Sequence, residues 1–167
     1  SDPLGNGCGH RPRQRLYVQP GEGGRRRGLA AKDCGVPIAV SFVVETDGCL
    51  DDGTGLEAAI DQVDELTDGA AAYFMVNCAH PDHFSQVLSG HPRLRGMAVN
   101  ASRCSHAELD DATELDDGDP MELGTEVARL MRKHPAMSVV GGCCGSDIRH
   151  MQAMADGILA RDQVRSS

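Results

Sequence analysis

The stretch SVVGGCCGSDIRH, residues 138–150, combines an apolar run, a glycine-rich turn and the start of a helix. The β-branched run before the glycines predicts a buried strand. Ser146 or Asp147 is placed to cap a helix that follows. Two adjacent cysteines, Cys143 and Cys144, stand in the turn between them. The stretch therefore predicts a strand–turn–helix unit that carries sulfur at the carboxyl end of its strand.

Three similar units precede this stretch. Short apolar runs predict buried strands, and each is followed by a helical spacing of apolar residues or by a helix start signal. Thr54 and Glu57 match a capping box, and Asp119 before Pro120 matches an N-cap followed by proline at the first helical position. A long acidic connection runs from the third strand to Asp119. The predicted strands cover residues 37–44, 71–77, 94–101 and 137–142.

Four strand–helix units in succession predict an α/β fold with parallel strands and right-handed crossovers. A doubly wound sheet and half of a (β/α)₈ barrel both satisfy the pattern, since a complete barrel needs roughly 250 residues. Both folds place function at the carboxyl ends of the strands. In this sequence the ends read Glu45-Thr46, Asn77-Cys78, Asn100-Ala101-Ser102 and Cys143-Cys144.

The start of the chain differs in composition from the rest. Residues 1–27 are rich in Arg, Gly and Pro and predict a disordered or atypical segment, with one domain expected over residues 28–167. The net charge of −9 argues against a nucleic-acid surface, and no apolar run is long enough to span a membrane. Seven cysteines without a visible secretory signal favour cytosolic thiols or metal ligands, and thus a cytoplasmic location.

The adjacent cysteines are best explained as metal ligands. They cannot bind one ion from a regular strand, because successive side chains point to opposite faces. They can do so from a turn, and the flanking glycines allow the dihedral angles that such a turn needs. Cys78, at a strand end two units upstream, is the candidate third ligand. Three thiolates leave one position of a tetrahedral Zn²⁺ open to a substrate thiol, so the predicted chemistry is alkylation of a thiol.

Two other uses of the cysteines stay open. His80 and His83 follow Cys78 closely enough for a local Cys-x-His-x-x-His metal site, although Pro81 favours a loop there. The adjacent cysteines are also candidates for a redox pair, but the Cys-x-x-Cys spacing typical of such pairs is absent.

Polar side chains at the other strand ends are expected to line the same pocket. Asn77 is a candidate for positioning the substrate, and Glu45 is a candidate for meeting an ammonium group. Ordinary capping of backbone groups at strand ends is the alternative explanation. The complete set of candidates for substrate binding is Ser41, Glu45, Asn77 and Asn100.

Several runs of the sequence resemble the homocysteine S-methyltransferase family. They are PIAVSFVVETDGCLDDGTGL (37–56), AYFMVNCAHPDHF (72–84), GMAVNASRCSHAELDDATELDDGDPMELG (96–124) and VVGGCCGSDIRHMQAMADGI (139–158). The resemblance extends from about residue 28 to about residue 160, and its GGCCG motif with an upstream Asn-Cys is specific.

The resemblance implies a fold, a cofactor and a reaction. The fold is a (β/α)₈ barrel, of which this chain matches the last four units. The zinc ligands carried over by motif are Cys78, Cys143 and Cys144. The implied substrate is homocysteine, the product is methionine, and the donor is an activated methyl compound such as S-methylmethionine or S-adenosylmethionine.

One departure from the family is large. The family opens with a strand that ends in an Asp-Gly motif, and residues 1–36 contain no counterpart. A half-barrel would have two open sheet edges and an inner face on which water touches Val, Phe and Met, so self-association is expected. Two functions therefore follow from the sequence: zinc-dependent methylation of homocysteine, or a non-catalytic zinc-binding half-barrel that needs a partner.

Overall fold

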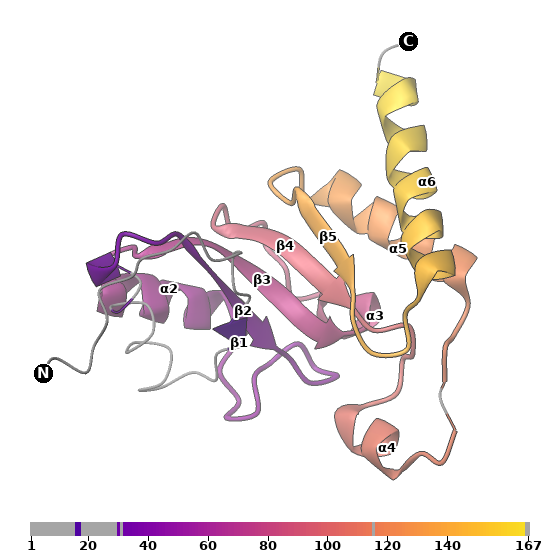
Figure 1. Ribbon diagram of the computed structural model, residues 1–167, viewed down its shortest axis with the longest axis horizontal. Coiled ribbons are helices and arrows are strands. Elements are labelled where there is room, and N and C mark those ends of the chain that lie inside the picture. Colours follow the sequence, from indigo (N-terminus) through magenta and orange to yellow (C-terminus); the bar gives the residue numbers. More distant parts are fainter. Residues whose placement is uncertain (1–15, 18–29, 31, 115, 166–167) are drawn as a thin grey trace, which may run out of the picture.

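A parallel β-sheet forms the centre of the computed structural model, which describes residues 16–17, 30, 32–114 and 116–165 (Figure 1). The strands lie side by side in the order in which they occur along the chain. They are β1 (Leu16–Tyr17), β2 (Ile38–Val43), β3 (Ala71–Ala79), β4 (Leu94–Val99) and β5 (Val139–Gly142).

The strand order decides between the two folds that the sequence left open. Every neighbouring pair of described strands is parallel, and the order β1-β2-β3-β4-β5 never reverses. A doubly wound sheet reverses its order at a switch point. The described sheet therefore winds in one direction only, as half of a (β/α)₈ barrel does, and the predicted α/β fold with parallel strands is confirmed.

β1 is a strand that the sequence analysis did not predict. Leu16 and Tyr17 pair with Val40 and Ser41 of β2, because a short extended segment is enough to occupy an open sheet edge. These two residues belong to the segment 1–27, and the rest of that segment lies outside the described residues. The predicted domain boundary near residue 28 therefore stays a prediction.

The longer helices cover one face of the sheet. Right-handed crossovers between successive neighbouring strands place all connecting helices on the same side. Apolar residues of β2, β3 and β4 accordingly form one buried cluster with residues of the helices that follow them, among them Leu56, Ile60 and Val127. The described helices are α2 (Leu56–Thr67), α3 (Pro81–Phe84), α4 (His106–Asp111), α5 (Pro120–Lys133) and α6 (Ile148–Arg165).

Two helix starts agree with the sequence. The Asp119 carboxylate accepts hydrogen bonds from the backbone N–H groups of Met121 and Glu122, which confirms it as the N-cap of α5. At the start of α6, the Asp147 carboxylate accepts from the N–H of Arg149 at 2.9 Å. Asp147 therefore caps the helix that follows the two adjacent cysteines.

The capping box predicted at Thr54 and Glu57 is wrong. The N-cap of α2 is Gly55, and no side chain caps it. The Glu57 carboxylate instead accepts hydrogen bonds from the N–H groups of Ser89 and His91, more than thirty residues further along the chain. A tertiary contact with the loop before β4 has replaced the local one.

The acidic connection before Asp119 is not a plain loop. It contains α4, whose N-cap Ser105 forms a reciprocal capping box with Glu108. The helix is short and has no buried residue, so it lacks the apolar spacing by which a helix is recognised in a sequence.

The expectation that water touches Phe and Met of a half-barrel is wrong for the central strands. Phe42 and Phe74 are buried in the cluster that the sheet shares with the helices, and their rings stack with centroids 5.9 Å apart. Met75 of β3 is also buried. The large side chains therefore contribute to the core.

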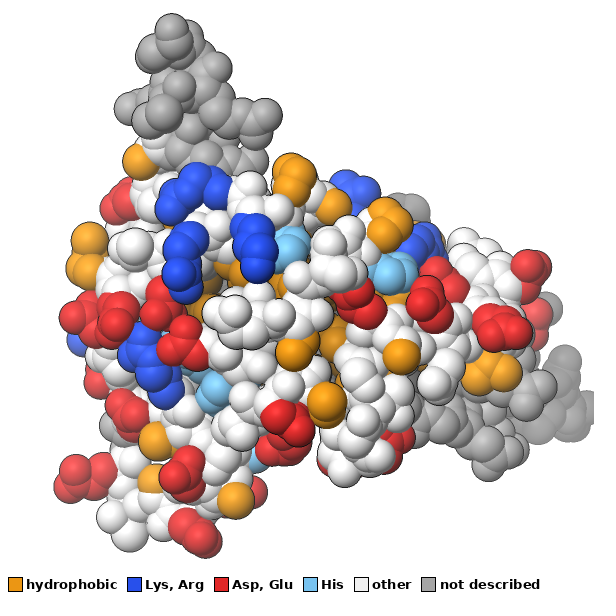
Figure 2. All heavy atoms as spheres, turned by 180° about the vertical axis from the view of Figure 1, so that it is seen from behind, with side chains coloured by type: hydrophobic (Ala, Val, Ile, Leu, Met, Phe, Trp, Pro, Cys, Tyr) orange, Lys and Arg blue, Asp and Glu red, His pale blue; other side chains and the backbone are white. Residues whose placement is uncertain are grey.

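The surface carries charges of both signs. On the face shown in Figure 2, acidic side chains are spread between and beside the basic ones. None of the described helices has an apolar stretch long enough to cross a membrane.

Candidate functional site

The three cysteines singled out by the sequence lie where two strands end. Cys78 is the penultimate residue of β3 and has a left-handed backbone, with φ of 50°. Cys143 and Cys144 directly follow β5 and form the turn that leads to α6. Because β3 and β5 flank β4 in the same parallel sheet, their carboxyl ends lie at the same edge.

The sulfur atoms of Cys78, Cys143 and Cys144 all lie within 4.8 Å of one another. The sulfurs of Cys78 and Cys143 are in disulfide contact, although 65 residues separate them in the sequence. Cys144 is a free, exposed thiol. The redox alternative would need a bond between the two adjacent cysteines, but Cys143 contacts Cys78 instead.

Glycine and backbone hydrogen bonds hold the turn that carries Cys143 and Cys144. The N–H of Cys143 donates to the carbonyl of Val99 at 2.7 Å, and the carbonyl of Cys144 accepts from Ala101 at 3.0 Å. Gly145 has φ of 75°, and a Cβ atom there would lie 2.8 Å from the carbonyl oxygen of Asp116. The glycine is therefore needed both for its dihedral angle and for the space.

Asn100 ties the two cysteine segments together. Its side-chain N–H donates to the carbonyl of Cys78, and its side-chain oxygen accepts from the N–H of Cys144, both at 3.1 Å. The residue is only 1 % exposed, so water does not compete for these bonds. Asn100 thus fixes the spacing between the end of β3 and the turn after β5.

Asn77 approaches the cluster from β3. Its side-chain N–H points at the sulfur of Cys143 across 3.7 Å, and the residue is 3 % exposed. Asn77 and Asn100, both predicted as lining residues, are therefore brought to the cysteines.

Ser41 lies in β2, and Glu45 lies two residues beyond the end of that strand. Ser41 is buried and pairs in register with Met75, two residues before the pair formed by Val43 and Asn77, so the two pairs share a face of the sheet. Glu45 follows the end of β2 and is half-buried. Among the described residues, no hydrogen bond or ion pair joins the Glu45 carboxylate to the three cysteines.

The local histidine alternative does not form. Within the described residues, the metal-compatible group that contains Cys78 includes neither His80 nor His83. The ring of His83 bonds the carbonyl of Arg103 at 2.9 Å, and Nε2 of His80 faces the Glu126 carboxylate at 3.5 Å.

His80, Asp82 and Glu126 form a second group of converging side chains that the sequence analysis missed. The positive charge in this group comes from Arg103, whose nitrogen atoms lie 2.7 Å from carboxylate oxygens of both Asp82 and Glu126. Burial, together with the charge of Arg103, lowers the pKa of His80 to about 4, so its ring is neutral at pH 7. The group is therefore an ion-pair network. Its members come from segments that lie far apart in the sequence, so no sequence motif marks them.

Comparison with known families matches residues 25–158 to homocysteine S-methyltransferase. No curated protein and no solved structure matched the chain. The family match covers most of the sequence and includes all three clustered cysteines. The chain therefore belongs to the homocysteine S-methyltransferase family.

Proposed function

We propose that the protein transfers a methyl group from a sulfonium donor, S-methylmethionine or S-adenosylmethionine, to the thiol of homocysteine, giving methionine. Membership of the family supports methyl transfer to a thiol in general. The observation that carries the proposal for this chain is the convergence of three cysteine sulfurs from two strand ends. A cytoplasmic location is part of the proposal, because that compartment keeps such thiols reduced.

The donor set fits zinc. Once the contact between Cys78 and Cys143 is reduced, Cys78, Cys143 and Cys144 would hold the ion, since thiolate sulfur is a preferred zinc ligand and the three sulfurs converge at one place. Three protein ligands leave one position for a substrate thiol. When bound, the ion would lower the pKa of that thiol and keep it as a nucleophilic thiolate near pH 7.

The chain's own residues would prepare the cluster for this chemistry. Asn77 donates toward the sulfur of Cys143 and offsets part of the negative charge that three thiolates bring together. Asn100 keeps the two cysteine segments at a constant separation. In the reaction, the homocysteine sulfur would form a bond to the methyl carbon while the donor's sulfonium sulfur leaves with the bonding electron pair as a neutral thioether. The thiol proton would pass to solvent.

The edge of the sheet supports a second candidate function, a zinc-binding half-barrel that acts only with a partner. β5 pairs with β4 on one side, and no described strand pairs with its other side. An unpaired edge strand is a template for pairing with another chain or with a second copy of this one. In that case the chain would bind zinc but would not turn over alone.

Metal analysis combined with a methylation assay tests both candidates. The purified, reduced 167-residue chain is loaded with zinc, dialysed and analysed for metal. It is then incubated with homocysteine and each donor, and methionine is measured by mass spectrometry. Bound zinc with methionine formation supports the enzyme. Zinc binding without methionine, together with self-association in sedimentation velocity, supports the half-barrel, and a chain that retains no zinc contradicts both.

A further inference from the structure

The bond between Cys78 and Cys143 uses two of the three sulfurs that the proposed zinc site needs. These sulfurs are in disulfide contact, and the Cα atoms of the two residues lie 5.5 Å apart. Disulfides usually span a Cα separation of about 4.4–6.8 Å, so the backbone of both segments suits the bond. Zinc is bound by thiolates, and a sulfur in a disulfide is no longer a thiolate. The bond and the metal therefore exclude each other.

Hydrogen bonds that involve no sulfur hold the cysteine segments together. The side chain of Asn100 donates to the carbonyl of Cys78 and accepts from the N–H of Cys144. The N–H of Cys143 donates to the carbonyl of Val99 at the end of β4. Because these bonds do not depend on the state of the sulfurs, the segments stay side by side whether the thiols are free or joined.

The cluster is accessible to small reagents. Cys144 is an exposed, free thiol, and Cys78 and Cys143 are half-buried. Oxidation of cysteine follows exposure and the presence of a second thiol that can complete a disulfide. Among the described residues, three other cysteines are free and belong to no metal-compatible group: Cys34, Cys49 and Cys104. An oxidant that joins two thiols of one chain therefore acts at this cluster.

We propose that the cysteine cluster is a redox switch, in which a hydroperoxide such as hydrogen peroxide joins Cys78 to Cys143 and releases zinc. The inference rests on the proposed zinc site. One thiolate attacks a peroxide oxygen and breaks the O–O bond, which gives a sulfenic acid and water. The second sulfur attacks the sulfenic sulfur, the S–S bond forms, and the S–O bond breaks with loss of a second water. The two thiolates lose two electrons to the peroxide, and solvent supplies two protons.

Release of the ion follows from the number of ligands. After oxidation Cys144 is the last thiol of the cluster, and a single thiolate does not provide the three protein ligands of a zinc site with an open position. The substrate thiol then has no metal to bind, and methyl transfer stops. Dithiothreitol reverses the change by thiol–disulfide exchange, because the hydrogen bonds of Asn100 keep both segments in place.

The test uses the reduced full chain, loaded with zinc and dialysed. Hydrogen peroxide is added in small excess, and released zinc is followed with a chromophoric chelator. Free thiols are then alkylated, and linked peptides are mapped by mass spectrometry after digestion without reductant. We expect about one zinc to leave each chain, with Cys78 linked to Cys143 and Cys144 alkylated. Dithiothreitol with fresh zinc should restore the bound metal.

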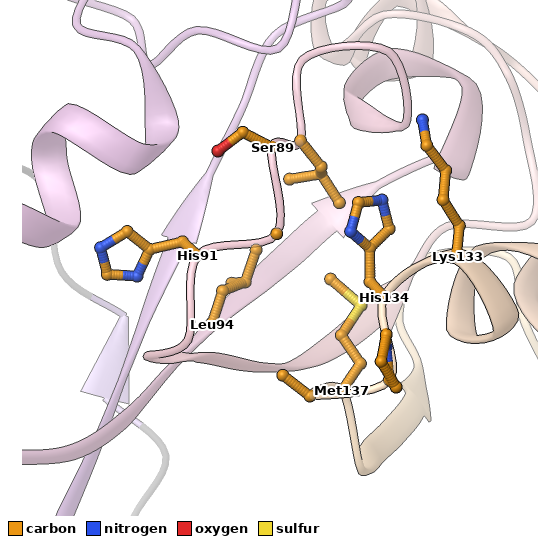
Figure 3. Close-up of a pocket in the computed structure, with 10 residues that line it drawn as sticks. Ser89, His91, Leu94, Lys133, His134 and Met137 are labelled. Carbon is orange, nitrogen blue, oxygen red and sulfur yellow. The ribbon is translucent and has the colours of Figure 1, made fainter.

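Met137 provides an internal control against unfolding. With the ring of His134 it lines a pocket of about 250 Å³ at the opposite end of the strands from the cysteines, and it is 3 % exposed (Figure 3). Peroxide reaches this sulfur only when the fold opens, so Met137 should stay unoxidised while zinc is released. The matched variant Cys104→Ser removes a free thiol outside the cluster and should behave like the wild type.

The switch is overturned if peroxide leaves zinc bound, if zinc leaves without a link between Cys78 and Cys143, if Met137 is oxidised in step with zinc release, or if dithiothreitol does not restore zinc binding. A failure of the proposed function looks different. Reversible zinc release in a chain that makes no methionine contradicts only methyl transfer, whereas zinc retained after peroxide in a chain that makes methionine contradicts only the switch. A reduced chain that takes up no zinc contradicts both.

Discussion

The side-chain amide of Asn77 lies 3.7 Å from the sulfur of Cys143, a residue 66 positions further along the chain. The two come from β3 and from the turn after β5, with β4 between their strands. The contact therefore exists only when the sheet is assembled in this order. It connects a predicted substrate-binding residue directly to a predicted metal ligand.

Replacing Asn77 with leucine should weaken zinc binding by about 10- to 100-fold, as is typical when a group that supports a metal ligand is lost. The substitution removes the N–H donor beside the sulfur and keeps a similar volume. Zinc affinity is measured by competition with a chromophoric chelator. Gln62→Leu, on the exposed side of α2, is the matched control and should bind zinc normally. Equal affinity in both variants would mean that the amide does not support the cluster.

Each of the three single variants Cys78→Ala, Cys143→Ala and Cys144→Ala should lose most of the bound zinc. Two thiolates do not complete the protein ligand set of a zinc site with an open position. Cys104→Ala serves as the control, because Cys104 lies near Ser102 and Asp116 and is not part of the cluster. Atomic absorption after dialysis gives the metal content. Full retention of zinc in all three cluster variants would refute the site.

Gly124→Ala should destabilise the fold by about 1–3 kcal/mol, the usual cost of overpacking a close contact. A Cβ atom at Gly124 in α5 would lie 2.6 Å from the backbone of Ala153 in α6, so the two helices would have to separate. Urea unfolding followed by circular dichroism measures the change. Thr125→Ala, at the exposed neighbouring position, should change stability far less. A fully stable Gly124→Ala variant would show that the helices do not pack this closely.

Glu57 should make the protein less stable in acid. Burial by itself would raise the pKa of the Glu57 carboxyl, but hydrogen bonds from Ser89 and His91 lower it, and the net pKa lies below the ordinary value of 4.5. A group with a lowered pKa in the folded state stabilises the fold above its unfolded pKa. That contribution is lost as the pH falls through the lower, folded value.

The free energy of unfolding measured in urea at about pH 7 and about pH 3.5 tests this linkage. The wild type should lose more stability between these pH values than Glu57→Gln, because the variant has no carboxyl to titrate. Glu65→Gln, on the exposed side of the same helix, should follow the wild type. The same loss in the wild type and Glu57→Gln would exclude Glu57 as a source of the pH dependence.

Much of the local structure could be predicted from the sequence alone. The sequence predicts β2 to β5 within a few residues of their observed bounds. The signals used, apolar runs and turn residues, depend only on residues close together in the chain. The Asp119 cap was predicted because an N-cap bonds to backbone only two or three residues away. The cysteines were recognised because two thiols between glycines suit a turn that binds metal and do not suit a core.

Only the tertiary structure decided the features that depend on residues far apart in the chain. The sheet order excluded the doubly wound alternative, which has the same succession of strands and helices. Glu57 bonds Ser89 instead of its own helix start, and Asn100 joins Cys78 to Cys144. The enclosed ring of His134 likewise follows from the packing of two loops. The sequence determined which residues can form strands, caps and ligands, whereas the pairing of distant segments decided their partners, because those contacts exist only once the sheet has brought the segments together.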